Sequence, residues 1–292
     1  MTAALLTCRD PLRARLPDPH FAAAVEAAEV LGRDVALIDH DALMQGGAGE
    51  AVARVPRGVG PLWYRGWMLP SSRYAELEDA LAERGTTLAT DALQYRRAHE
   101  LPGWYKTFAA VTPRSVWLPA QPGQALPAAR LAELAASLGS GPVVVKDYVK
   151  SRKHEWDEAC FVPDAADTEQ LAAVVRNFVE LQEEFLAGGI VLRTFEEFTG
   201  DEVRVWWIDG SPALTTAHPD AYGDGASRLV PQLDHVAPLV RALGCRFVTT
   251  DLALRSDGVW RVVEVGDGQV SDLPATVAQR LLLEPLLTSQ RS

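Results

Sequence analysis

Three of the four lysines in the chain fall in one short segment. Lys146, Lys150 and Lys153 lie within VVVKDYVKSRK, whereas elsewhere the chain uses arginine almost exclusively, with 24 arginines in 292 residues. A lysine ammonium is a flexible point charge that suits phosphate groups, while a guanidinium is a planar fork. The segment therefore predicts a phosphate-binding strand and loop. The alternative is a chance cluster of charges on a solvated loop.

Two carboxylates lie on the last predicted hairpin, FVTTDLALRSDGVWRVVEV. If the turn consists of Arg255 to Gly258, Leu254 faces Val259. Asp251 and Glu264 are then diagonal neighbours on one face, with Cα atoms about 7–8 Å apart. Neighbouring carboxylates in apolar strands repel each other and are costly to desolvate, and a divalent cation relieves both effects. Oxygen ligands favour magnesium, or manganese, over zinc. The alternative is that both acids point to solvent, and a register change of one residue would place them on opposite faces.

Lysines suited to phosphate and carboxylates suited to magnesium together predict a magnesium–nucleotide site. The sequence contains neither G-x-x-x-x-G-K-[ST] nor G-x-G-x-x-G, which argues against P-loop and Rossmann sites. The H-R-D and D-F-G signatures of protein kinases are also absent.

Alternating strands and helices are predicted in the N-terminal part. A strand at 3–7, a helix at 19–31 and a strand at 35–38 follow one another, an order typical of a parallel sheet. Ser71 or Ser72 is expected to cap a later helix.

The C-terminal part is predicted to begin after a linker rich in proline and glycine, from Pro113 to Pro127. A helix at 128–139 precedes the strand that carries Lys146, and Asp167 is placed to cap a longer helix. Most of the remaining chain is predicted to be strand. The fold class is therefore α+β, with mixed α and β elements.

Composition limits the class of protein. The chain is 48% hydrophobic with a net charge of −11, and its length suggests about two domains. The acidic balance argues against a general nucleic-acid binder, and no apolar run is long enough to span a membrane. Three separated cysteines give neither a disulfide framework nor a zinc spacing. We expect a soluble cytoplasmic protein of unknown oligomeric state.

The order of these parts resembles the ATP-grasp superfamily. The resemblance covers roughly Gly141 to Pro274. Lys146 matches the nucleotide-binding strand lysine of that family, and YVKSRK matches the loop that closes over the phosphates. Asp251 and Glu264 match its two acidic metal-binding positions.

The resemblance also assigns the nucleoside contacts. The segment EEFTGDEVRV looks like the hinge strand of the family. There the backbone of Glu197 and Phe198 would meet adenine, and Glu202 would hold the ribose hydroxyls.

Two features depart from the family pattern. The phosphate loop of the family is usually rich in glycine, and here it carries lysines and an arginine. The family usually ends its metal cluster with E-x-N, and here Gly266 stands at the asparagine position. Asp267 or Gln269 could supply the missing oxygen, which leaves the number of metal ions open.

The resemblance implies a domain division and a cofactor. We expect a small N-terminal α/β unit at 1–112 and an ATP-grasp domain at 113–292. The latter would divide into a nucleotide-covering part, 113–198, and a metal-binding part, 199–292. The implied cofactors are ATP and Mg²⁺, with Mn²⁺ as the alternative ion.

ATP-grasp proteins mostly join a carboxylate to an amine or thiol through an acyl phosphate. Such chemistry needs cations near the transferred phosphoryl group, and Arg193, Arg204 and Lys153 are the candidates. For each arginine the alternative is an ordinary salt bridge.

Two aromatic segments are candidates for substrate binding. Tyr64 and Arg65 lie in LWYRGW, and Lys106 lies in HELPGWYKTF. Aromatic rings around a cation suit an acidic or amino-acid-like ligand. The alternative for the first segment is a protein core that contains an arginine.

The sequence thus predicts an ATP-grasp carboxylate–amine ligase that forms ADP and acts on small-molecule or peptide substrates. One alternative is a phosphotransferase that acts on a hydroxyl group with the same site. Another is a nucleotide-binding module without catalysis, which the Gly266 departure permits.

Overall fold

The computed structural model describes residues 4–218 and 230–289. The chain divides into two compact units. Unit 1 comprises residues 1–98, 200–252 and 264–292, and unit 2 comprises 99–199 and 253–263. This division differs from the expected one in two ways: the first boundary lies at 98/99 rather than 112/113, and the tip of the last hairpin belongs to unit 2.

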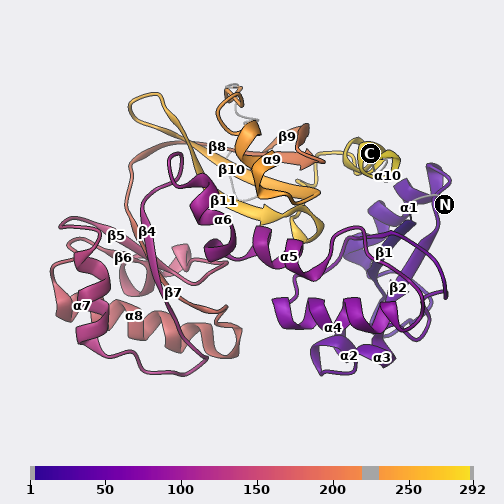
Figure 1. Ribbon diagram of the computed structural model, residues 1–292, viewed down its shortest axis with the longest axis horizontal. Helices are drawn as coiled ribbons and strands as arrows, with labels where there is room; N and C mark the ends of the chain where they lie inside the picture. Colours follow the sequence, from indigo (N-terminus) through magenta and orange to yellow (C-terminus); the bar gives the residue numbers. More distant parts are fainter. Residues whose placement is uncertain (1–3, 219–229, 290–292) are drawn as a thin grey trace. The chain divides into compact units, whose positions relative to one another are not determined.

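The first sheet of unit 1 is parallel, as the alternating pattern predicted. Its order is β2-β1-β3, and β1 pairs in parallel with both neighbours. Leu6 and Cys8 pack in one core cluster with residues of the helices that follow β2, whereas Leu5 packs in another with Ala24 and Ala28. Helices therefore cover both faces of this sheet (Figure 1). The elements are β1 Ala4–Cys8, η1 Pro19–Phe21, α1 Ala22–Val30, β2 Val35–Ile38, α2 His40–Met44, α3 Ala48–Ala51, β3 Leu62–Tyr64 and α4 Ser71–Ala82, followed by α5 Ala92–His99, whose last residue lies in unit 2.

A second sheet has the order β11-β10-β8-β9 and lies mostly in unit 1. Strands β8 and β9 form an antiparallel hairpin, with a register shift between Trp206 and Trp207. The sequence placed these two rings on opposite faces and at least one of them in the core, and both are fully buried. The elements are β8 Phe198–Ile208, β9 Ser211–Ala217, α9 Ala237–Leu243, β10 Phe247–Arg255, β11 Trp260–Asp267, η5 Gly268–Val270 and α10 Arg280–Thr288.

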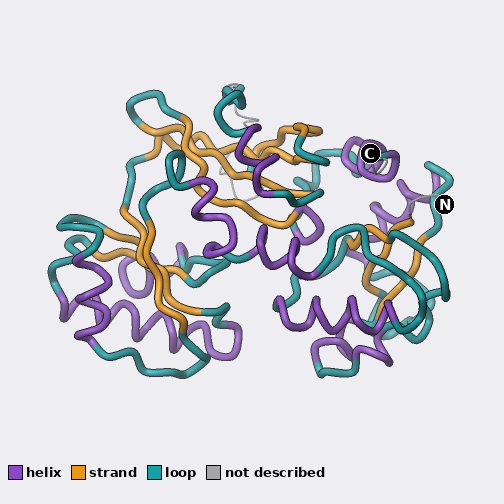
Figure 2. The backbone as a smooth tube through the Cα atoms, in the orientation of Figure 1, coloured by secondary structure: helices purple, strands orange, loops and turns teal. Residues whose placement is uncertain are grey.

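Unit 2 contains an antiparallel sheet of order β4-β7-β5-β6. Helices α7 and α8 share one core cluster with this sheet and lie beside it in Figure 2. The elements are α6 Leu101–Phe108, β4 Ser115–Pro119, α7 Ala128–Ala136, β5 Val143–Lys146, η2 Lys153–Glu155, η3 Trp156–Cys160, β6 Phe161–Val162, α8 Thr168–Gln182, η4 Glu183–Phe185 and β7 Gly189–Thr194.

Some local predictions are confirmed and others are wrong. Asp167 caps α8, because its side chain accepts from the backbone N–H of Gln170. The predicted linker at Pro113 to Pro127 is wrong in part, since it contains β4, which pairs with β7. Helix α4 begins after Pro70 without a side-chain cap. Among the described helices, none has the length and apolarity needed to cross a membrane.

Candidate functional site

The lysine segment begins at the buried end of β5. Lys146 is the last residue of the strand and is 4% exposed, and its Nζ donates to the carbonyl oxygen of Val149 at 3.3 Å. The chain turns back at once, since Lys146 forms an isolated bridge with Ser151. Lys150 and Lys153 are exposed. The segment therefore presents one buried and two exposed ammonium groups.

Asp147 fixes the backbone of this turn. Its Oδ1 accepts from the N–H groups of Val149 and Lys150, at 2.7 and 2.6 Å. Its Oδ2 accepts from Gln182 Nε2 at 2.7 Å and from the N–H of Ala187 at 3.2 Å. Burial raises the pKa of Asp147, although these hydrogen bonds oppose the rise. Sequence analysis missed this residue because half of its donors lie far from its own segment.

Two buried groups report that the three lysines act on one region of unit 2. Burial lowers the pKa of His99 to about 4, and the charges of Lys150 and Lys146 lower it further. Burial raises the pKa of Cys160 to about 11, while Lys146 and Lys153 act in the opposite direction. Both groups are therefore uncharged near neutral pH and do not offset the positive charge of the lysines.

The expected hinge residues divide between the units. Glu197 and Phe198 lie in unit 2, where the carbonyl oxygen of Glu197 accepts from the N–H of Ser256 at 3.3 Å and Phe198 is 37% exposed. Glu202 lies on β8 within unit 1.

The turn of the last hairpin differs from the prediction by one residue. Arg255, rather than Leu254, bonds Val259, with its N–H 2.9 Å from the carbonyl oxygen. Gly258 has φ of +83° and donates to the carbonyl of Arg255, so the loop has three residues. A uniform register from this turn would place Asp251 and Glu264 on opposite faces.

An extra residue in β11 restores the shared face. A Cβ at Gly266 would lie 2.9 Å from Thr249 Oγ1, and one at Gly268 would lie 2.7 Å from the Phe247 ring, so these pairs face each other. Between the turn and Thr249, β11 therefore holds one residue more than β10, as in a β-bulge. Two residues from this pair along each strand, Asp251 lies opposite Glu264.

Asp251 is held by a buried arginine. Arg204 on β8 donates from Nε to Asp251 Oδ1 at 2.7 Å and from Nη2 to Oδ2 at 2.8 Å. Burial raises the pKa of Asp251, but the charge and hydrogen bonds of Arg204 and His218 lower it well below its usual range. The pKa of Arg204 is raised in turn by Asp251, and then by Glu264 and Glu202, against the effect of burial.

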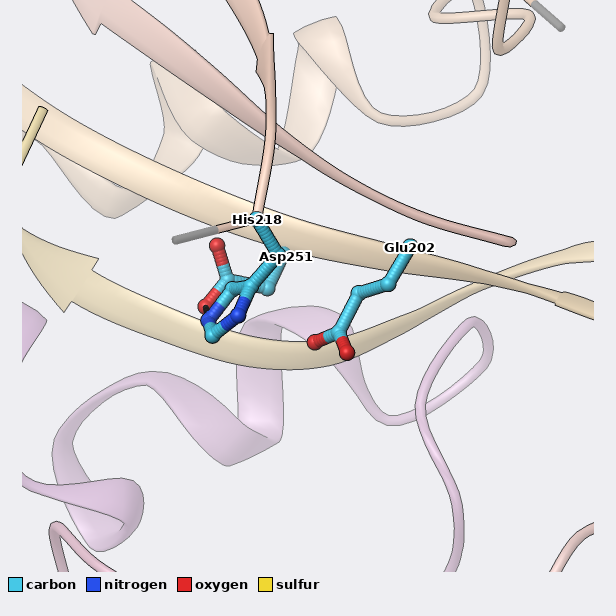
Figure 3. Close-up of side chains that lie close together, drawn as sticks. All are labelled: Glu202, His218 and Asp251. Carbon is cyan, nitrogen blue, oxygen red and sulfur yellow. Dashed lines mark ion pairs between the residues drawn. The ribbon is translucent and has the colours of Figure 1, made fainter. Parts of the chain in front are cut away.

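A group that could hold a metal ion surrounds Asp251. Ligand atoms of Glu202, His218 and Asp251 all lie within 4.8 Å of one another (Figure 3). His218 Nε2 lies 3.4 Å from Asp251 Oδ2, and the pKa of His218 is raised by Asp251 although burial lowers it. Sequence analysis did not assign His218, and it gave Glu202 a ribose contact rather than a place beside Asp251.

Asp267 lies in a different setting from the predicted metal ligand. It is fully buried, and its Oδ1 accepts from the backbone N–H and the side-chain amide of Gln269. Gln269 also bonds Tyr74 in the core of unit 1. The structure therefore gives Asp267 a role in joining the end of β11 to the first sheet.

The two residues predicted to bind substrate in LWYRGW lie in the interior of unit 1. Arg65 is 4% exposed and donates to the carbonyl oxygens of Gly268, Gln269 and Ser271. Burial lowers the pKa of Arg65 to about 10, although it remains protonated at neutral pH. The Tyr64 hydroxyl donates to the carbonyl of Trp67 at 2.7 Å. This setting agrees with the alternative of a core arginine.

Arg193 and Lys106 lie in unit 2. Arg193 is 8% exposed, donates to Ser115 Oγ and to the carbonyl oxygen of Val263, and lies over the ring of Trp104. Lys106 is exposed on α6.

Comparison with known proteins identifies the class. A family model described as an ATP-grasp domain, family 3 of its clade, matches residues 137–285, just over half of the chain. The fold is therefore the ATP-grasp fold of mixed α and β elements. Within that superfamily, the chain belongs to this third family of the clade. No curated protein matches the chain.

Solved structures share the fold at low sequence identity. D-cycloserine synthetase DcsG has a TM-score of 0.61 at 16% identity, with 97% of this chain and 99% of that chain covered. A RimK domain protein ATP-grasp from Sphaerobacter thermophilus has a TM-score of 0.60 at 15% identity, with 97% and 100% covered. D-alanine–D-alanine ligase from Bacillus anthracis, complexed with ATP, has a TM-score of 0.58 at 14% identity, with 98% and 96% covered.

Proposed function

We propose that this chain is an ATP-dependent ligase that activates a carboxylate as an acyl phosphate and couples it to an amine, with ADP and phosphate as products. The observation that carries the proposal is the lysine segment, in which Asp147 holds the turn that joins Lys146 to Lys150. Membership of the ATP-grasp family and similarity to structures named as ligases support it.

The proposed reaction has two steps. A carboxylate oxygen of the substrate attacks the γ-phosphorus of ATP and the bond to the β–γ bridging oxygen breaks, which gives an acyl phosphate and ADP. The amine nitrogen then attacks the acyl carbon, the bond to the phosphate oxygen breaks, and the nitrogen loses a proton, so an amide and phosphate are formed. Neither step needs a covalent bond to the protein, so positioning and charge stabilisation supply the catalysis.

Unit 2 is proposed to bind the nucleotide. Lys146, Lys150 and Lys153 would neutralise phosphate oxygens, because three ammonium donors on a fixed turn can each approach a different oxygen. The backbone of Glu197 and Phe198 is proposed to contact adenine. Arg193 is proposed to add positive charge from the β7 side, although its Nε and Nη1 already bond protein oxygens.

Unit 1 is proposed to hold Mg²⁺ through carboxylate oxygens of Asp251 and Glu264. Arg204 takes one acceptor position on each Asp251 oxygen, and a carboxylate has about four such positions, so the donor set still fits a hard divalent cation. When bound, this ion would neutralise phosphate charge. Arg204 is proposed to fix the orientation of Asp251, and Glu202 to bind either the same ion or a ribose hydroxyl.

A thermal-shift titration tests nucleotide binding. Ligands that bind only the folded state raise the midpoint according to RT ln(1 + [L]/Kd). ATP and ADP are expected to raise it more with magnesium than without, and more than AMP or GTP does. The proposal is refuted if no nucleotide raises the midpoint under any of these conditions.

Matched variants test the residues. Lys146→Ala is expected to abolish most of the ADP shift, whereas Lys106→Ala, which replaces the one lysine outside the segment, should keep it. Glu264→Gln should lose the magnesium-dependent part of the shift, while Glu29→Gln on an exposed face of α1 should not. Equal shifts in each pair would remove the site assignment.

Product analysis separates the ligase from the two alternatives. A screen of carboxylates and amines with ATP should give an amide and stoichiometric ADP. A stable phosphorylated hydroxyl compound would instead identify a phosphotransferase. Tight nucleotide binding without turnover of any pair would favour the non-catalytic module.

A further inference from the structure

A small pocket lies at the carboxyl ends of the parallel strands of unit 1. Arg9 follows β1 directly, Asp39 follows β2 directly, and Trp67 lies three residues beyond β3. Because β1 is central and the chain passes from β2 on one side to β3 on the other, this edge is a topological switch point, where ligands bind in open α/β sheets. The lining residues are Arg9, Pro11, Asp18, Asp39, His40, Asp41 and Trp67.

The pocket has an excess of negative charge. Three carboxylates line it, against one guanidinium, and Arg9 is already paired with Asp39. Asp18 Oδ2 accepts from Trp67 Nε1 at 3.0 Å, which orients the carboxylate beside the indole. Asp41 is 63% exposed, and the ion pair found for it is with His40 Nδ1 at 3.7 Å. Asp18 and Asp41 are therefore left to attract a cation.

Aromatic and polar surface complete the pocket. Trp67 is 38% exposed, and its ring lies 4.6 Å from that of His20 and 5.1 Å from that of Phe21, so its position is fixed by packing. An exposed indole held in this way can bind a cation on its face. The Nε2 atom of His40 is buried and has no hydrogen-bond partner within residues 4–218 and 230–289. A ligand in the pocket could supply that partner.

A short chain of contacts within unit 1 joins the pocket to Asp251. His20 Nε2 bonds Asp272 Oδ1 at 3.0 Å, and Arg204 Nη1 donates to the carbonyl oxygen of Asp272 at 3.3 Å. Arg204 in turn holds both oxygens of Asp251. One residue, Asp272, thus separates the wall of the pocket from the arginine at the proposed metal site.

We propose that this pocket binds a positively charged ammonium end group of the amine substrate, a conclusion that rests on the proposed ligase function. Asp18 and Asp41 attract the ammonium group and Trp67 contacts it through its ring. The pocket has a volume of about 220 Å³ including the part open to solvent, which is less than a typical small-molecule site. It therefore takes the end of a ligand rather than a whole molecule.

Binding of three small probes of similar shape tests the proposal. Propylammonium chloride, sodium propionate and 1-propanol are titrated into the full chain, and the indole N–H resonance of Trp67, assigned with Trp67→Phe, is followed by NMR. Propylammonium is expected to shift it with a Kd of about 1–10 mM, and the other two probes are not. Asp41→Asn should weaken binding by about 3- to 5-fold, whereas Asp79→Asn, the same charge change at an exposed position of α4, should leave it unchanged.

The outcomes separate this proposal from the proposed function. A Trp67 resonance that propylammonium leaves in place, or that propionate or propanol shifts equally, overturns the pocket assignment. An unchanged affinity in Asp41→Asn does the same. The thermal shift with magnesium and ADP is measured on the same samples, so loss of the nucleotide shift alongside selective propylammonium binding would refute the ligase and leave a cation site.

Discussion

Replacing Asp267 with asparagine is expected to remove a pH-dependent loss of stability. The Asp267 side chain is fully buried, and Gln269 donates two hydrogen bonds to its Oδ1, at 2.8 and 3.1 Å. Within the described part of the chain, Oδ2 has no hydrogen-bond partner. Burial therefore raises the pKa of this carboxyl from 3.8 to about 7, against the opposing effects of Gln269 and Arg65.

The sign of the effect follows from the direction of this shift. The folded chain keeps a proton on Asp267 that the unfolded chain has lost, so the stabilisation is complete below about pH 4 and disappears as the pH rises through about 7. A gap of about three pH units corresponds to about 4 kcal/mol. Roughly 2–3 kcal/mol of this is lost between pH 5 and pH 8. Asparagine keeps the oxygen that Gln269 bonds and carries no charge.

Urea unfolding followed by circular dichroism at pH 5, 6, 7 and 8 measures the effect. The unfolding free energy of Asp267→Asn, relative to the natural chain, should rise by about 2–3 kcal/mol from pH 5 to pH 8. Asp79→Asn, on the exposed face of α4, should run parallel to the natural chain. If Asp267→Asn also runs parallel, the reasoning from burial is refuted. The magnesium-dependent ADP shift should survive in this variant, because Asp267 is left out of the proposed metal set.

Three further variants test the parts that support the site. Asp147→Ala leaves four buried or partly buried donors without their acceptor and should cost about 3–5 kcal/mol in urea unfolding, together with ADP affinity. Arg204→Gln leaves the Asp251 carboxylate buried without its cation and should cost about 3–5 kcal/mol, a loss that a small effect on unfolding would contradict. Gly188→Ala places a Cβ 2.3 Å from the Tyr148 ring at φ of +71° and should cost about 2–4 kcal/mol, whereas Gly123→Ala at φ of +69°, with open space around it, should cost about 1 kcal/mol.

Local patterns predicted the elements whose stability is local. The apolar runs at 35–38 and 143–146 are strands, and the Asp167 cap precedes α8, because periodicity and capping act within a few residues. Strand β4 was missed because the prolines and glycines around it indicate a loop, and its pairing partner β7 lies about 75 residues away in the sequence. The turn at Arg255 was displaced by one residue because Gly258 adopts a left-handed conformation that closes a three-residue loop.

Prediction of the candidate site depended on how its charges are spaced along the chain. The lysine segment is visible in sequence because its members are neighbours. Arg65 and Arg193 are not distinguishable in the same way, since their partners include backbone carbonyls, which every residue carries. With 24 arginines in the chain, residue type alone does not separate an arginine that holds two segments together from one that meets a substrate.

The pocket at the ends of β1, β2 and β3 shows what the sequence could have predicted and did not. Its residues are spread over about 60 positions, at Arg9, Asp39 and Trp67, and no motif joins them. The parallel order of the strands was predicted, however, and the carboxyl ends of parallel strands meet at one edge of a sheet. The first charged or aromatic residues after each strand were therefore candidates from the sequence alone. A parallel sheet brings such residues together wherever they fall in the chain, which is why the strand ends, rather than the aromatic segment LWYRGW within and after β3, carry the stronger inference about the amine substrate.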